Sequence, residues 1–264
     1  MEISISTTLF GTQFPFLKGV ELLYEAGYRT IEISRKNPDT GKEKKILNDM
    51  GIKVWSIHGT LGNGSASLSE DERKKAVASE YLRMEDTSVF APCPYVVHYL
   101  HRYNNREHGV AFRKSLEELH EKAIELGLNI AVETVPYKPR MNERHPFSVE
   151  IAEFVRSFKS PNLSLCIDIN HSNINENLED VARNCKGVIS TIHVSDNHGE
   201  WEDHLPPGEG IIKLPGVLRE LRNCGYSGPC NIECHVESIP PAVEMLSGMR
   251  EFVAEQIRLS YSEN

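Results

Sequence analysis

Short apolar segments alternate with longer amphipathic segments along the whole of this 264-residue chain. The apolar segments predict strands, which we place at Glu2–Thr7, Arg29–Ser34, Lys53–His58, Tyr95–Leu100, Asn129–Val135, Leu163–Ile169, Ile189–Val194 and Cys230–His235. Helical spacing of apolar residues predicts helices at Phe14–Ala26, Gly41–Met50, Ser69–Phe90, Arg106–Leu126, Phe147–Phe158, Leu178–Cys185, Leu214–Asn223 and Pro241–Arg258. This alternation is typical of parallel strands joined by helices.

Eight strand-and-helix units in a chain of this length favour one architecture. A (β/α)8 barrel typically needs about 250 residues, so the sequence predicts an α/β chain with a single TIM-barrel domain over residues 1–264. The alternative is a doubly wound open sheet. No GxGxxG motif follows the first predicted strand, however, and this disfavours the dinucleotide-binding form of that fold.

Charge and hydropathy exclude some classes of function. The formal net charge is −9, which disfavours nucleic-acid binding because phosphate contacts need a basic surface. The basic run Arg73, Lys74 and Lys75 is flanked by acidic residues, and we interpret it as a solvated helix face. No apolar run is long enough for a membrane span, and the first residues lack a basic signal segment, so we expect a cytoplasmic protein.

One polar stretch, residues 189–210, gathers side chains that are costly to bury without partners. Its potential metal ligands are His193, Asp196, His198, Glu202, Asp203 and His204. Imidazole and carboxylate groups are ligands for zinc, manganese, iron and cobalt. The stretch therefore indicates either a metal site or a solvated polar loop.

Residues of the same types stand at the ends of most predicted strands. They are Glu32, His58, His98, Glu133, Asp168, His171, His193 and Glu233. The carboxyl ends of barrel strands meet at one mouth, where the active site of this fold lies. Glu133, Asp168, His193 and Glu233 come from four successive strands and are predicted to converge on one divalent cation.

Several of these residues also have simpler interpretations. His58 or His98 alone is compatible with a core histidine, Glu32 with a rim carboxylate, and His235 with a surface residue. Trp201 is predicted either to stack on a ligand ring or to cover the site. The loop after the fifth strand offers groups for a substrate anion, or is an ordinary surface loop; these are Lys138, Arg140, Arg144 and His145.

The motifs VETVP, CIDINH, HVSDN, DHLPPGEG and NIECH resemble those of the xylose isomerase-like TIM-barrel superfamily, which includes sugar isomerases, sugar epimerases and endonuclease IV. Resemblance to the ketose 3-epimerases implies one divalent ion (Mn, Co, Mg, Fe or Zn) on Glu133, Asp168, His193 and Glu233, with His171 at the substrate. Those epimerases usually carry an arginine six residues after the strand-seven histidine. This chain has Gly199 there, a departure that affects the predicted substrate contacts.

The resemblance and the residue types predict an isomerase or epimerase acting on a carbohydrate: a sugar, a keto-sugar or a sugar-derived acid. Glu133 and Glu233 are predicted to transfer protons at the carbon next to a carbonyl. The substrate-binding residues are predicted to be His58, His98, His171, Trp201 and His204. Related barrels are often dimers or tetramers, which leaves a homo-oligomer open.

A second function remains open from the sequence. Resemblance to endonuclease IV implies up to three zinc ions, a phosphodiesterase activity and abasic-site DNA as substrate. The additional ligands would be His58, His98, His171, Glu202 and His204. A metal-binding protein without turnover is the third alternative.

Overall fold

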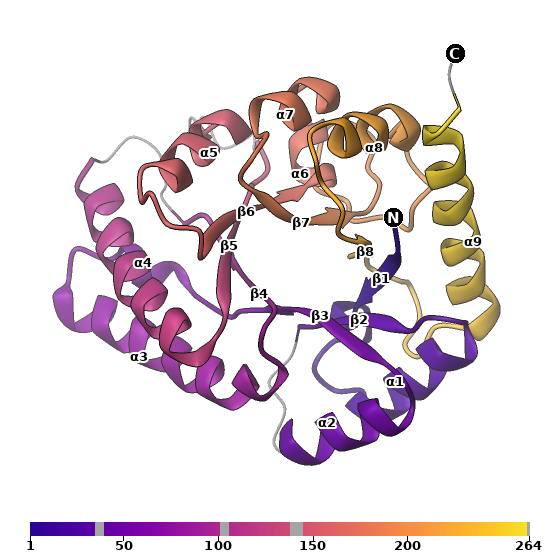
Figure 1. Cartoon of the computed structure of the whole chain (residues 1–264), viewed down its shortest axis with the longest axis horizontal. Coiled ribbons are helices and arrows are strands. Elements are labelled where there is room, and N and C mark those ends of the chain that lie inside the picture. Colours follow the sequence, from indigo (N-terminus) through magenta and orange to yellow (C-terminus); the bar gives the residue numbers. More distant parts are fainter. Residues whose placement is uncertain (35–39, 101–105, 138–144, 263–264) are drawn as a thin grey trace.

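The computed structural model describes residues 1–34, 40–100, 106–137 and 145–262. Eight parallel strands form a closed barrel in chain order, with β8 paired to β1 (Figure 1). The strands are β1 (Ile3–Ser6), β2 (Thr30–Ile33), β3 (Lys53–His58), β4 (Pro94–His98), β5 (Asn129–Glu133), β6 (Leu163–Asp168), β7 (Ile189–Val194) and β8 (Cys230–Ile232). The predicted (β/α)8 barrel is therefore confirmed.

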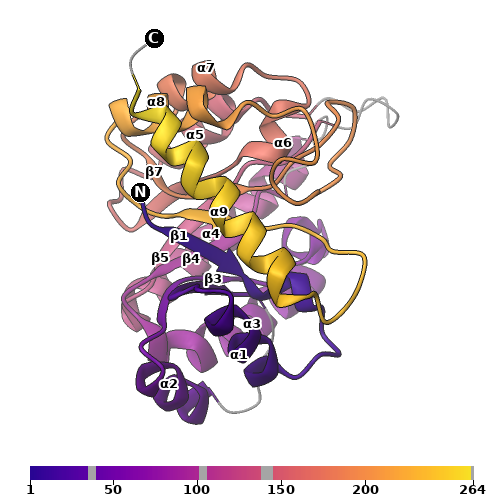
Figure 2. The same ribbon diagram turned by 90° about the vertical axis from the view of Figure 1, so that its right-hand side faces the viewer.

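The helices surround the barrel, and α9 crosses the outside of the molecule beside β1 and α1 (Figure 2). They are α1 (Phe16–Glu25), α2 (Thr40–Asp49), α3 (Glu70–Thr87), α4 (Arg106–Leu126), α5 (Ser148–Arg156), α6 (Ile169–Asn173), α7 (Leu178–Asn184), α8 (Leu214–Asn223) and α9 (Val243–Ser260). Short 3₁₀ turns lie at Thr7–Phe10, Asn63–Ala66 and Ser88–Phe90. None of the described helices combines the length and apolar character that a membrane crossing requires.

Three sequence predictions differ from the structure in detail. His171 lies in α6 rather than in the sixth strand, because the Asp168 side chain accepts a hydrogen bond from the His171 backbone N–H and starts a helix there. Glu233 follows β8 instead of closing it, although its N–H still pairs with the carbonyl of Val194. Arg73 is not solvated like Lys74 and Lys75; it is buried, because its side of α3 packs on α4.

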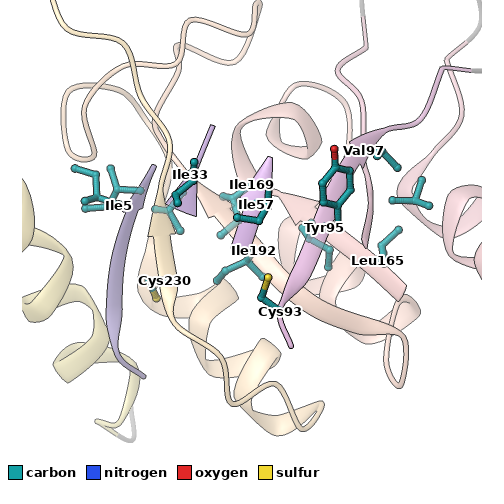
Figure 3. Packing of buried hydrophobic residues seen from close by; sticks show 14 of the residues in the cluster. Ile5, Ile33, Ile57, Cys93, Tyr95, Val97, Leu165, Ile169, Ile192 and Cys230 are labelled. Atoms are coloured by element: carbon teal, nitrogen blue, oxygen red, sulfur yellow. The ribbon is translucent and has the colours of Figure 1, made fainter. Parts of the chain in front are cut away.

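The hydrophobic core lies mainly between the barrel and the helices, and Figure 3 shows part of it. Strand residues alternate in character, as in Ile31–Glu32–Ile33, where both isoleucines belong to this outer core. A separate small apolar cluster, consisting of Val96, Ala131 and Cys166, lies on β4, β5 and β6. By the same alternation these three residues face the barrel axis.

Trp55 on β3 enters the interior, where its Nε1 donates to Thr191 on β7, and most of the remaining inward positions of the barrel are polar. They include Ser4, Ser6, Glu32, Ser56, Thr191 and Asn231, all fully buried. Parallel strands covered on both faces are usually apolar on both, and barrel interiors are usually filled by branched apolar side chains. The polar half of this interior lies on β1, β2, β3, β7 and β8 and leads towards the strand ends that carry the histidines and carboxylates.

Candidate active site

Most of the predicted strand-end residues line one cavity at the mouth of the barrel. Its volume is about 400 Å³, within the range of about 300–1,000 Å³ typical of small-molecule sites. The lining residues are Thr8, Ser34, His58, Asn63, His98, Tyr99, Leu100, Glu133, Val135, Pro136, His145, His171, Glu202, His204, Glu233 and His235. This set contains most of the sequence-predicted site residues.

His193 lies beneath the cavity and joins three carboxylates. Its Nδ1 atom is 2.6 Å from Glu233 Oε2 and 3.0 Å from Glu133 Oε1. Its Nε2 atom is 3.1 Å from Glu32 Oε2. The ring has no exposed surface, so these contacts form without competition from bulk water.

Two further histidines approach the Glu133 carboxylate from the β3 and β4 ends. Its Oε2 atom lies 3.2 Å from His58 Nε2 and 3.3 Å from His98 Nε2. His58 Nε2 is also 3.8 Å from Glu233 Oε1. One nitrogen of His58 therefore contacts both the Glu133 and the Glu233 carboxylate, which places these two carboxylates close together.

Burial and mutual charge act against each other in this group. Burial disfavours the charged forms, yet the contacts with Glu233 and Glu133 raise the pKa of His58 to about 10. Burial likewise opposes ionisation of Glu133, but His98 and His193 lower its pKa well below the usual range. Burial also disfavours a charged His193, and the surrounding carboxylates still raise the pKa of this ring well above its ordinary value.

The donor chemistry of this group fits a divalent cation. One ligand atom from each of His58, Glu133, His193 and Glu233 lies within 4.8 Å of the others, and all four residues are buried. The raised pKa values of His58 and His193 show that positive charge is favoured between these carboxylates. A divalent ion would supply a charge of two at this position. The nitrogen and oxygen ligand atoms here are types that bind zinc, manganese, iron and cobalt.

A second group lies beside the first. Asp168, His171 and His204 also offer ligand atoms within 4.8 Å of one another. His171 Nε2 is 3.2 Å from His204 Nε2 and 3.6 Å from Glu202 Oε2. The predicted ligand Asp168 thus falls in this second group, and His171 Nδ1 lies 3.9 Å from Glu133 Oε1, which connects the two.

Asp196 fixes the loop that carries Glu202 and His204. Its carboxylate accepts hydrogen bonds from the backbone N–H groups of Asn197, Gly208 and Ile212, at 2.9 to 3.0 Å. Gly210 is needed here because a Cβ atom would come within 2.3 Å of an Asp196 oxygen. Asp196 therefore has backbone partners for both carboxylate oxygens and serves as the structural centre of this loop rather than as a cavity group.

The other residues predicted from residues 189–210 are spread over the loop surface. His198 is exposed and pairs with Asp203 at 3.1 Å, away from the residues that line the cavity. Trp201 is 39% exposed and is not part of the cavity lining, so its contact with substrate stays a prediction. His145 lines the cavity, whereas Lys138, Arg140 and Arg144 lie outside the described residues.

Some site residues were not singled out by the sequence. Thr8 donates a hydrogen bond to Glu233 Oε1 at 3.2 Å, and its hydroxyl also contacts Ser34. His235 is exposed, as interpreted from the sequence, and it also lines the cavity, with its ring 5.2 Å from that of His204. Thr8 lies in the 3₁₀ turn directly after β1, so its nearness to the end of the first strand is the signal that could have placed it at the mouth.

The chain is similar in sequence to one protein family and to several individual proteins. The xylose isomerase-like TIM barrel family matches residues 20–255. An uncharacterised protein of Methanocaldococcus jannaschii, MJ1614, is 32% identical over 84% of this chain and 88% of that protein. The match to a second protein of that organism, MJ1311, is 30% identical and spans 50% of that relative. The L-ribulose-5-phosphate 3-epimerase UlaE of Escherichia coli O1:K1 is 28% identical over 90% of this chain and 88% of that enzyme.

Solved structures share the fold. A D-tagatose 3-epimerase-like protein superposes with a TM-score of 0.83 at 22% identity, over 98% of both chains. An L-ribulose 3-epimerase gives a TM-score of 0.83 at 18% identity, over 98% of this chain and 96% of that one.

Proposed function

We propose that this chain, which belongs to the xylose isomerase-like TIM-barrel family, is a divalent-metal-dependent epimerase or isomerase of a sugar, keto-sugar or sugar-derived acid. One observation carries the proposal: Glu133 and Glu233 line a single cavity, and both contact His58 Nε2, at 3.2 and 3.8 Å. Two carboxylates placed around one carbon suit proton transfer on both of its faces. Similarity to UlaE supports a sugar as substrate.

The metal ligands proposed for the ion are Glu133, His193 and Glu233. Asp168 is the fourth ligand expected from the family resemblance, and His58 offers a nitrogen within 4.8 Å of the other three. When bound, a divalent ion supplies polarisation of the substrate carbonyl and its neighbouring hydroxyl.

In the proposed mechanism, the chain's own residues move the proton. One glutamate removes it from the carbon beside the carbonyl, and the other glutamate returns a proton to the opposite face. His171 and His204 line the cavity beside this pair and would form hydrogen bonds with sugar oxygens. The burial of Glu133 and His193 limits the access of water to the reacting carbon.

A panel of keto-sugars and their phosphates, incubated in D2O with the protein and Mn2+, tests the proposal. An epimerase or isomerase should incorporate solvent deuterium at the carbon next to the carbonyl of at least one substrate. Glu133→Gln and Glu233→Gln should each abolish that incorporation. Retained incorporation in both variants would contradict the two-carboxylate mechanism.

The second group of ligands favours one alternative, a zinc phosphodiesterase of the endonuclease IV type acting on abasic-site DNA. Its support is the proximity of Asp168, His171 and His204, with Glu202 3.6 Å from His171. Two or three zinc ions per chain and cleavage of abasic-site DNA would favour this reaction. Absence of cleavage by zinc-loaded protein that epimerises a sugar would exclude it.

A further inference from the structure

We propose that Glu32 is a positioning residue, which holds the Nε2 proton of His193 and thereby directs the Nδ1 lone pair into the metal site. The inference deepens the proposed function and rests on it in one respect, since it takes His193 as a metal ligand. Glu32 is absent from the cavity lining, so it acts on the site through His193 and touches neither substrate nor ion.

The two nitrogens of His193 face different surroundings. Nδ1 faces Glu133 and Glu233, which line the cavity, whereas Nε2 faces Glu32 at 3.1 Å. A neutral imidazole carries one proton, so one nitrogen donates and the other accepts. A histidine that binds an ion through Nδ1 must carry its proton on Nε2, and the acceptor for that proton is Glu32.

Without Glu32, the opposite tautomer would be favoured. The carboxylates of Glu133 and Glu233 both lie within hydrogen-bond distance of Nδ1, so they would attract the single ring proton to that atom. A protonated Nδ1 cannot bind a cation. A carboxylate on the far nitrogen removes this competition, and such outer carboxylates are the usual partners of metal-binding histidines.

Glu32 is itself held in place for this role. Ser56 Oγ donates a hydrogen bond of 2.7 Å to Glu32 Oε2, the same oxygen that contacts His193. The side chain is fully buried, and the outer face of β2 is packed by Ile31 and Ile33; Figure 3 shows Ile33 in this core. Core packing therefore gives no reason for a carboxylate at this position, whereas His193 does.

The tautomer of His193 in the wild-type protein tests the inference without any variant. Long-range 1H–15N correlation spectra of ¹⁵N-histidine-labelled protein loaded with Zn2+ should show a protonated Nε2 and a zinc-bound Nδ1 on His193. Assignment comes from the signal lost in His193→Gln. A protonated Nδ1 in the zinc-loaded protein would overturn the proposal.

Zinc affinity, measured by competition with a chelator, gives the second test. Glu32→Leu should weaken Zn2+ binding by about 10–100-fold and shift His193 towards the Nδ1–H tautomer. Glu32→Gln, which keeps an acceptor oxygen, should restore much of the affinity. Ser4→Ala is the matched control, because Ser4 is another fully buried inward serine and its hydroxyl has no hydrogen-bond partner within the described residues; this variant should keep the wild-type affinity.

The outcomes separate this inference from the proposed reaction. A Glu32→Leu protein with wild-type zinc affinity and an unchanged Nε2–H tautomer would contradict the role of Glu32, even if sugars are epimerised. The predicted tautomer and affinity loss would support that role, even in a protein that epimerises none of the sugars tested.

Discussion

The barrel mouth and the contact between α3 and α4 both bury charged side chains, but they pair those charges to different degrees. Between the helices, the guanidinium of Arg73 is 1% exposed and donates to Glu70, Glu118 and Ser115, at 2.7 to 3.1 Å. Its two carboxylate partners are half-buried and still reach water. Each charge in this helix cluster thus has a partner or solvent.

The mouth cluster, formed by Glu32, His58, Glu133, His193 and Glu233, is arranged differently. Three fully or nearly fully buried carboxylates surround two imidazoles, and Glu32 Oε1 makes no hydrogen bond within the described residues. A fold gains nothing from collecting like charges in its interior. Every charge in the helix cluster is paired or solvated, so we interpret that cluster as structural. The charges of the mouth cluster are incompletely paired, which indicates a site for a ligand.

The largest expected effect is on catalysis in the mouth cluster. Glu133→Gln and Glu233→Gln should each lower kcat of sugar epimerisation by about 10²–10⁴-fold, because each removes one proton-transferring group. Their thermal stability should change little, since each substitution relieves repulsion between buried carboxylates but also removes a charge that pairs with the imidazoles. Steady-state kinetics and thermal unfolding of the same preparations measure both effects.

Arg73→Met provides the matched comparison for these variants. It should leave kcat near the wild-type value, because Arg73 lies outside the cavity lining. A strong loss of activity in Arg73→Met, or a strong loss of stability in the Glu133 and Glu233 variants, would break the distinction between the two clusters.

Asp196→Ala should have the next largest effect. Removing a buried carboxylate that accepts three backbone hydrogen bonds should destabilise the protein by about 3 kcal/mol and displace His204 in the cavity. The value of kcat/KM should then fall by about 10–100-fold. Urea denaturation and kinetics measure the two changes; His198→Ala, an exposed position of the same loop, serves as the control and should match the wild type.

The sequence predicts the place of a residue well when that place follows from the local strand pattern, and poorly when it depends on distant or backbone partners. His58, Glu133 and His193 stand at strand ends, and a parallel barrel brings all strand ends together, so the local pattern was enough to gather them. Asp196 looked like a ligand because its partners are backbone amides, which no pattern of side chains reveals. The role of Glu32 was equally hidden, since it depends on a histidine that lies 161 residues along the chain.

The burial of Arg73 was missed for a similar reason. Its neighbours in sequence are charged, and Lys74 and Lys75 are exposed as predicted. Only the packing of α3 on α4 brings Glu118 to within 2.7 Å and makes burial of the guanidinium acceptable. The barrel itself followed from local periodicity, whereas this pairing depends on the orientation of two helices.

Replacing Arg73 in the helix cluster should have a moderate effect on the stability of the protein. Arg73→Met should lower the free energy of unfolding by about 2 kcal/mol, because the lost hydrogen bonds are charge-assisted while Glu70 and Glu118 remain in contact with water. Urea denaturation at pH 7 measures the change. A variant as stable as the wild type would show that the cluster is not stabilising.

The smallest expected effect is a dependence of stability on pH. Hydrogen bonds from Arg73 and Lys114 lower the pKa of Glu70 from its ordinary 4.5 to about 2. A carboxyl with a lowered folded-state pKa stabilises the fold above its unfolded pKa, and this contribution is lost as pH falls from 4.5 towards 2. Glu70→Gln should therefore be less stable than the wild type at pH 6, and the difference should shrink on acidification. A difference independent of pH would contradict this assignment.

The central claim is that the mouth cluster holds a divalent ion, and the metal content per chain tests it most directly. Elemental analysis of protein purified without added metal or chelator should find about one divalent ion per chain, whether Mn, Co, Mg, Fe or Zn. The metal should be lost in His193→Ala and retained in Arg73→Met. Wild-type protein that carries no metal, and whose thermal stability does not respond to any of these ions, would contradict the account.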